Sequence, residues 1–242
     1  MQGFLIGVLT VLLIAAILIG MGVLWINWRL HQLAGDRYTD RDREKFISFL
    51  AGVLVPIIFR VKVEVKGLEY LNGSDRAVLF PNHQSFVDIP VLLNGIKRPH
   101  GYVAKIEMDH KFIISQGMRL IRCEFMDRED VRQSVKVISN AAKTVKSGHM
   151  MVIFPEGTRV VNGEMGLFKA GSFKIAQKSA ADIFPVTIYN TPKAQKRWPK
   201  KTTVKVEVHP PLTPEMYQGM STAQIAEKVE AVVKAPLKEG RV

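Results

Sequence analysis

The sequence predicts an α/β fold, a mixed β-sheet covered by helices, preceded by an N-terminal two-helix membrane-binding segment. Residues 3–26 form one apolar run, residues 46–59 form a second, and after Arg60 short strand-like runs alternate with amphipathic ones. Alternation of strands and helices is typical of a sheet with helices packed against it. We therefore expect a two-helix membrane anchor over residues 1–60 and an α/β domain over residues 61–242.

The first apolar run has the length and composition of a membrane helix. Its 24 residues include no charged side chain, and Trp25 and Trp28 lie at its end. As a helix it would be about 36 Å long, enough to cross a hydrocarbon core of about 30 Å, and tryptophan favours the membrane interface. A cleaved signal peptide is the main alternative, but the run is too long for one and has no clear cleavage site.

The charges after this run predict its orientation. Five basic residues follow it, namely Arg29, Arg37, Arg41, Arg43 and Lys45. Because cationic loops stay on the cytoplasmic side, a spanning helix would leave the rest of the chain at the cytoplasmic face. Whether the run spans the bilayer or lies in one leaflet stays open.

The second apolar run is too short to span. Its 14 residues would make a helix about 21 Å long, and Pro56 would bend its end. We interpret it as a helix in the membrane interface, antiparallel to the first and joined to it by polar residues 35–45. A buried core helix is the alternative.

Charge and cysteine content limit the partners. A net charge of +12 fits nucleic acid, an anionic membrane or an anionic substrate, and the apolar N-terminus favours membrane lipids over nucleic acid. The single cysteine, Cys123, allows no internal disulfide and supplies too few ligands for a Cys/His metal site. We expect a reduced, cytosol-facing domain with no metal and no organic cofactor.

Periodicity places the remaining elements. Strands are expected at residues 61–65, 77–80, 102–104, 121–125, 150–154, 183–189 and 203–208, and helices at residues 86–94, 130–146, 172–179 and 221–233. Ligands of such folds gather at the carboxyl ends of the strands. Two polar clusters follow directly after expected strands.

The first cluster contains His83 and Asp88. The strand at residues 77–80 leads into Pro81-Asn82-His83-Gln84-Ser85-Phe86-Val87-Asp88. At this spacing the carboxylate can return to the imidazole, fix its tautomer and stabilise the imidazolium that forms when histidine accepts a proton. The alternative is structural, because Ser85 and Asp88 have the spacing of a helix capping box.

The second cluster is Phe154-Pro155-Glu156-Gly157-Thr158-Arg159. Gly157 permits a tight turn or a close approach to a ligand, and the fork of donors on Arg159 matches a phosphate group. Glu156 could orient Arg159 or bind a substrate hydroxyl. The alternative is a surface loop with an incidental Glu–Arg pair.

Four motifs in this order resemble the glycerolipid acyltransferase family, specifically the 1-acylglycerol-3-phosphate (lysophosphatidate) acyltransferases. The resemblance covers residues 61–208 and is carried by Asn82-His83-x4-Asp88, Phe125-Met126-Asp127-Arg128, Phe154-Pro155-Glu156-Gly157-Thr158-Arg159 and Phe184-Pro185-Val186. The chain departs from the second motif, because no proline follows Lys105 before Phe125, although Gly117 could serve as the turn glycine. This departure concerns the shape of the acceptor pocket.

The resemblance implies a membrane-bound acyltransferase that makes phosphatidic acid for phospholipid biosynthesis. His83 would be the base and Asp88 its partner, and the acyl group would pass directly from acyl-CoA or an acyl carrier protein to the sn-2 hydroxyl of lysophosphatidic acid. Substrate-binding residues would be Glu156, Gly157, Thr158, Arg159, Lys105 and Arg128, with Arg159 on the phosphate. Backbone N–H groups near residues 155–157 would stabilise the oxyanion.

Two other functions stay open. The enzyme could use glycerol-3-phosphate or another lysolipid as acceptor. The chain could also be a non-enzymatic membrane adaptor that binds anionic lipid through its basic surface, although this would leave the His–Asp pair unexplained.

Overall fold

A mixed sheet forms the centre of the molecule in the computed structural model, which describes residues 1–160 and 165–238. Within those residues seven strands form one sheet in the order β1-β7-β6-β2-β5-β3-β4. The strands are β1 (Val61–Lys66), β2 (Ala77–Pro81), β3 (His100–Lys105), β4 (Glu124–Met126), β5 (Met150–Val152), β6 (Asp182–Tyr189) and β7 (Thr202–Val208). Neighbours are parallel except β6 and β7. The predicted fold class is confirmed.

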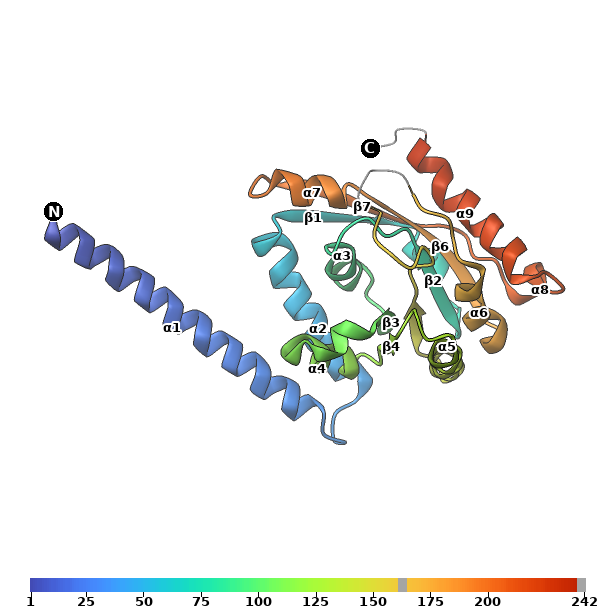
Figure 1. The fold of residues 1–242 in the computed structure, drawn as a ribbon, viewed down its shortest axis with the longest axis horizontal. Helices are drawn as coiled ribbons and strands as arrows, with labels where there is room; N and C mark the ends of the chain where they lie inside the picture. Colours follow the sequence, from blue (N-terminus) through green and yellow to red (C-terminus); the bar gives the residue numbers. More distant parts are fainter. Residues whose placement is uncertain (161–164, 239–242) are drawn as a thin grey trace.

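Helices cover both faces of the sheet (Figure 1). They are α1 (Gln2–Leu33), α2 (Asp40–Val53), α3 (Asp88–Gly95), α4 (Phe112–Leu120), α5 (Val131–Lys146), α6 (Lys174–Ser179), α7 (Thr191–Arg197), α8 (Pro214–Tyr217) and α9 (Thr222–Lys238). Side chains alternate along a strand, so Leu79 and Phe80 of β2 enter different cores. Leu79 packs in the core that includes residues of α1–α4 and α7, and Phe80 in the core of α5, α6 and α9.

Several element boundaries differ from the sequence prediction. The helix expected from residue 86 begins at Asp88, because the preceding residues form a turn. The strand expected from residue 121 begins at Glu124, since Arg122 adopts a left-handed φ of 57° in the turn after α4. Helices α4, α7 and α8 were not predicted. Helices α7 and α8 are too short to show a helical period, whereas α4 is amphipathic and its signal was overlooked.

The first helix, α1, extends away from the domain (Figure 1). Its apolar side chains are exposed along most of its length, and only Leu30 and Leu33 near its end are buried. Among the described residues it is the one helix long and apolar enough to cross a membrane. The membrane-helix prediction is consistent with this exposed surface.

The second apolar run belongs to a longer helix than predicted. Thr39 caps α2 in a reciprocal capping box with Asp42, so the helix begins inside the stretch expected to be a linker. One face of this region is buried, with Ile47, Ala51 and Val55 in the same core as the sheet. The other face exposes Phe49, Val53, Leu54, Ile57 and Ile58. The two interpretations of this run, as a buried core helix and as a helix in the membrane interface, therefore each describe one of its faces. The domain boundary at residue 60 stays a prediction.

Candidate active site

His83 lies at the carboxyl end of β2, where the structure brings it onto Asp88. Nδ1 of His83 is 2.8 Å from Oδ2 of Asp88. The same oxygen accepts the N–H groups of Gln84 and Ser85, each at 2.8 Å, and the Asp88 side chain is fully buried. A carboxylate that accepts at Nδ1 favours the Nδ1–H tautomer, which leaves Nε2 as the basic nitrogen.

The imidazole is held by packing as well as by Asp88. Its ring stacks on Phe154, which follows β5, with centroids 4.0 Å apart. Asn82 fixes the strand end, since its side-chain amide exchanges two hydrogen bonds with the backbone of Ile188 in β6, at 2.7 and 3.0 Å. In the described part of the chain, Nε2 of His83 has no hydrogen-bond partner. The one unengaged ring nitrogen is thus the one that a base would use.

Ser85 and Asp88 form only one of the two hydrogen bonds of a helix capping box. Asp88 accepts the Ser85 N–H, but the Ser85 hydroxyl accepts from the N–H of Val87 and lies 3.1 Å from Oε1 of Gln195. A full capping box would place that hydroxyl on the N–H of Asp88. Asp88 therefore shapes the turn and holds the imidazole with the same oxygen.

Glu156 joins the two sequence clusters. Its Oε1 accepts the His83 N–H at 2.6 Å and its Oε2 accepts the Gly166 N–H at 2.8 Å. Val160 N–H donates to the His83 carbonyl at 3.0 Å, so the loop lies along the histidine backbone. Burial raises the pKa of Glu156 to about 7, although the two N–H donors oppose this shift. Across residues 1–160 and 165–238 no ion pair connects Glu156 with Arg159.

Arg159 and Thr158 are exposed on this loop, one and two positions before the contact that Val160 makes with His83. Gly157 has a φ of 71°, which favours glycine, and a Cβ there would lie 2.9 Å from Nζ of Lys169, at the flexible end of that side chain. Lys169, a further cation at this loop, was not among the residues predicted from the sequence. We expected backbone N–H groups near residues 155–157 to stabilise the oxyanion. The Gly157 N–H donates to the Phe154 carbonyl instead, so it is not free for this role.

Lys105 and Arg128 lie at the ends of two neighbouring strands, β3 and β4, with Glu107 between them. Lys105 forms an ion pair with Glu107, and the pKa of Glu107 is lowered by this hydrogen bond and, more weakly, by Arg128. Partial burial lowers the pKa of Arg128, and the charge of Glu107 opposes that shift. The proline-free stretch after Lys105 forms a 3₁₀ helix, and Gly117 packs α4 against Ile47 rather than forming a turn.

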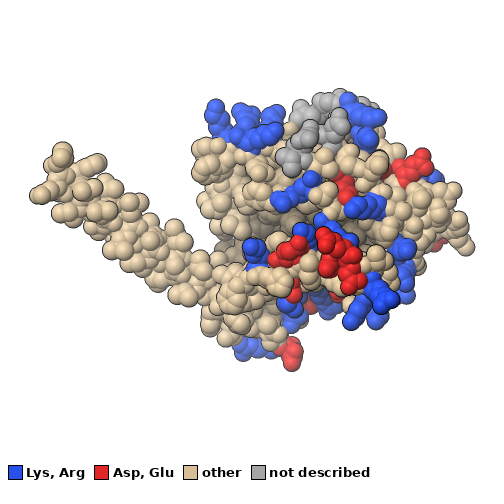
Figure 2. Space-filling model, viewed as in Figure 1, with Lys and Arg blue, Asp and Glu red and all other residues tan. Residues whose placement is uncertain are grey.

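The order of the strands aligns these residues along one edge of the sheet. The carboxyl ends of β2, β5, β3 and β4 are neighbours, so His83, Arg159, Lys105 and Arg128 follow one another along it. Figure 2 shows basic and acidic side chains around the middle of this face. The fourth motif lies in β6, where Phe184 and Val186 are buried beside β2. A histidine oriented by a buried carboxylate, at a sheet edge that also carries cations, is suited to accept a proton from an anionic substrate.

A family model described as Acyltransferase matches residues 62–189, so the chain belongs to the acyltransferase family. This confirms the resemblance at the level of the family. The match contains His83, Asp88, Lys105, Arg128 and the Glu156–Arg159 loop.

Named relatives and one solved structure are similar to the chain. A chloroplastic 1-acyl-sn-glycerol-3-phosphate acyltransferase of Brassica napus is 34% identical over 157 residues, which are 64% of this chain and 45% of that protein. A probable 1-acyl-sn-glycerol-3-phosphate acyltransferase of Mycoplasma pneumoniae is 27% identical, over 84% of this chain and 81% of the relative. The crystal structure of the 1-acyl-sn-glycerophosphate acyltransferase PlsC from Thermotoga maritima shares the fold, with a TM-score of 0.75, 24% identity and coverage of 90% and 91%.

Proposed function

We propose that this protein transfers a fatty acyl group from a thioester to the sn-2 hydroxyl of 1-acylglycerol-3-phosphate, giving phosphatidic acid. The observation that carries the proposal is the His83–Asp88 contact of 2.8 Å beside the loop that presents Arg159. The printed names of the relatives support the acceptor. The chain spans about 45% of the length of its Brassica relative, so activity and substrate belong to this proposal.

The proposed reaction is a direct transfer. Nε2 of His83 takes the proton of the sn-2 hydroxyl, whose oxygen attacks the thioester carbonyl. The C–S bond then breaks, and the thiolate leaves with the proton from the imidazolium. Asp88 stabilises the charged imidazolium in between. The atoms balance without a metal or an organic cofactor. We therefore predict that neither is needed, and unchanged turnover in EDTA would support the part of this prediction that concerns a metal.

The acceptor's phosphate would bind the cations along the sheet edge. Arg159 directly precedes Val160, whose N–H donates to the His83 carbonyl, and Lys105 and Arg128 follow along the same edge of the sheet. Arginine can grip a phosphate with two donors. Glu156 is held by backbone N–H groups, which supports a role in positioning His83 in place of the substrate contact expected from the sequence.

The membrane helices would keep the acyl chains in lipid. Each CH₂ buried in lipid contributes about 0.8 kcal/mol, so moving a whole acyl chain into water would cost far more than a site could repay. Exposed apolar side chains on α1 and on the outer face of α2 supply a surface for the bilayer. A catalytic domain on the cytoplasmic face follows from the basic residues after α1.

Thiol release with palmitoyl-coenzyme A tests this function. We expect release that depends on lysophosphatidate, with little release when glycerol-3-phosphate or a neutral lysolipid replaces it. Faster release with one of those acceptors would change the substrate. A full-length protein that binds anionic vesicles and releases no thiol with any acceptor would be an adaptor.

A further inference from the structure

Helices α5 and α6 carry a group of exposed cations on one side of the sheet. We call the following residues the α5–α6 surface: Arg132, Lys136, Lys143, Lys146, Lys174 and Lys178. Neither helix contains an acidic residue, and within the described residues none of the six forms an ion pair. Unpaired charges of one sign produce a field that extends into solvent. Figure 2 shows basic side chains around the end of α5 that faces the viewer.

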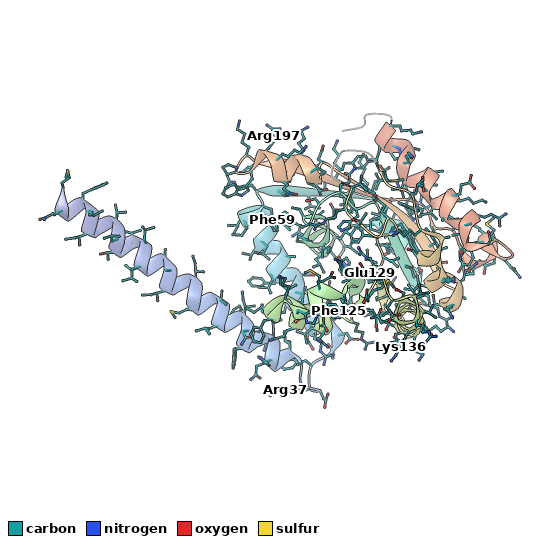
Figure 3. The ribbon with its side chains drawn as sticks, in the orientation of Figure 1. Arg37, Phe59, Phe125, Glu129, Lys136 and Arg197 are labelled. Carbon is teal, nitrogen blue, oxygen red and sulfur yellow. The ribbon has the colours of Figure 1, made fainter. Side chains whose placement is uncertain are left out.

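This surface begins beside the candidate active site. Helix α5 starts three residues after Arg128, and Lys169, which precedes α6, donates its N–H to Pro155 at 2.9 Å. Because β5 follows α5 and ends at the site, α5 runs from the site edge of the sheet to the opposite edge, a length of about 24 Å. Glu129 and Asp130 border the surface at the site end, where Figure 3 labels Glu129 and, on α5, Lys136.

The α5–α6 surface differs from the other basic group of the chain, on and after α7. There Trp198 is 62% exposed, and its Nε1–H donates to the carbonyl of Ile58, which is itself exposed. Cations next to exposed tryptophan and isoleucine suit a membrane interface. Helix α7 also packs in the same core as α1 and α2.

The α5–α6 surface lies in the opposite layer. Helices α5 and α6 pack in the second core, across the sheet from α1 and α2. Only Val131 and Val135 add exposed large apolar side chains on α5, both in its first half. A membrane that holds α1 and α2 would therefore not cover this surface, and its partner must come from the aqueous phase.

We propose that the α5–α6 surface docks a small acidic carrier protein that delivers the acyl thioester. This rests on the proposed function, in which a soluble donor must reach the site. Four of the six cations lie along α5, which is about 24 Å long, and this row matches an extended acidic face. The few phosphates of coenzyme A would cover only one end of such a row. Val131 and Val135 offer an apolar contact next to the site, and steering by opposite charge accelerates encounter by about 10- to 1000-fold.

A charge-reversal variant of the full-length protein tests this docking. We would measure kcat/KM of Lys136→Glu/Lys143→Glu with two donors, a palmitoylated acyl carrier protein and palmitoyl-coenzyme A, with lysophosphatidate as acceptor. We expect at least a tenfold loss with the carrier and a change below about twofold with coenzyme A. The wild-type rate with the carrier should also fall as the Debye length shortens from about 30 to 8 Å.

A matched control reverses two charges on α7, in Lys193→Glu/Lys196→Glu. It should keep the carrier reaction and weaken sedimentation with anionic vesicles. Equal losses with both donors, or lost vesicle binding in the α5–α6 variant, would overturn the carrier assignment. No wild-type turnover with the carrier would also overturn it, while the proposed function would still stand on palmitoyl-coenzyme A. No turnover with either donor would reject the proposed function itself.

Discussion

The two halves of the candidate site hold their charged side chains in different ways. At the ends of β2 and β5, Asp88 and Glu156 are buried and accept backbone N–H groups, and His83 stacks on Phe154. At the ends of β3 and β4, Lys105 and Glu107 are exposed and interact mainly with each other. The first half fixes the position of the His83 imidazole, which is the proposed base. The second half keeps side-chain freedom, which suits a charged headgroup that arrives with its water.

The largest effect should come from His83→Ala. It removes the proposed base, and a positioned base contributes about 10²- to 10⁴-fold, so turnover should fall by at least that factor. Thiol release measures it. The matched control is His110→Ala, because His110 is exposed on the other half of the site and should be dispensable. Near-normal turnover of His83→Ala with an unchanged melting temperature would remove the mechanism.

Asp88→Asn should come next. The amide cannot accept as a carboxylate does from His83, Gln84 and Ser85 together, and it favours the wrong imidazole tautomer. We expect turnover to fall by about 10²-fold or more with little change in KM. A loss confined to KM would show that Asp88 acts on binding and not on the imidazole.

Glu156→Gln tests whether the buried half depends on this carboxylate. The pKa of Glu156 is raised from 4.5 to about 7, so between these values the folded protein holds a proton that the unfolded chain releases. This group therefore lowers the free energy of unfolding as pH rises from about 4.5 to 7, and the variant should show a flatter dependence there. Thermal unfolding at several pH values measures it. A dependence as steep as in the wild type would contradict the raised pKa.

The same variant leaves one of two buried N–H groups without an acceptor, which costs about 1–3 kcal/mol. If Glu156 positions His83, turnover should fall while KM for the acceptor changes little. A rise in acceptor KM at constant turnover would instead support the substrate contact expected from the sequence.

The exposed charged residues of both halves should give smaller effects, which concern substrate binding rather than turnover. Arg159→Ala should raise the acceptor KM by about 10- to 100-fold, the value of one charged hydrogen bond, and leave the donor KM unchanged. Glu107→Gln frees Lys105 and Arg128, so the acceptor KM should fall by about two- to fivefold. Lys228→Ala is the control for charge alone, because Lys228 is exposed on α9 away from the site edge and from the α5–α6 surface. Equal changes in donor and acceptor KM would contradict these roles.

The sequence predicted what depends on local spacing. His83 and Asp88 are five residues apart, and the strand before them was apparent from its apolar run, so their contact could be expected. Glu156 lies 73 residues from His83, and their contact exists only because β2 and β5 are neighbours in the sheet. Strand order is set by the packing of the whole domain and leaves no trace in a short motif.

Other features of the structure that were not predicted had a weak signal in the sequence. Thr39 and Asp42 have the spacing of a capping box, but the surrounding charges favoured a linker. Glu107 was not among the predicted site residues, because the two cations near it lie at the ends of different strands, β3 and β4. Lys169 faces Gly157 through a loop whose path no periodicity describes.

The last turn of α1 is built into the globular domain. Leu30 and Leu33 are buried there, Arg43 donates to the Leu33 carbonyl at 2.9 Å, and Asp40 pairs with Arg122 at 2.6 Å. These contacts make the junction between α1 and the domain a rigid connection and not a flexible linker. If α1 enters a bilayer as proposed, this junction would hold the candidate active site at one height and tilt above the headgroups, and the proposed lysophospholipid would have to rise to that level to meet the His83 imidazole.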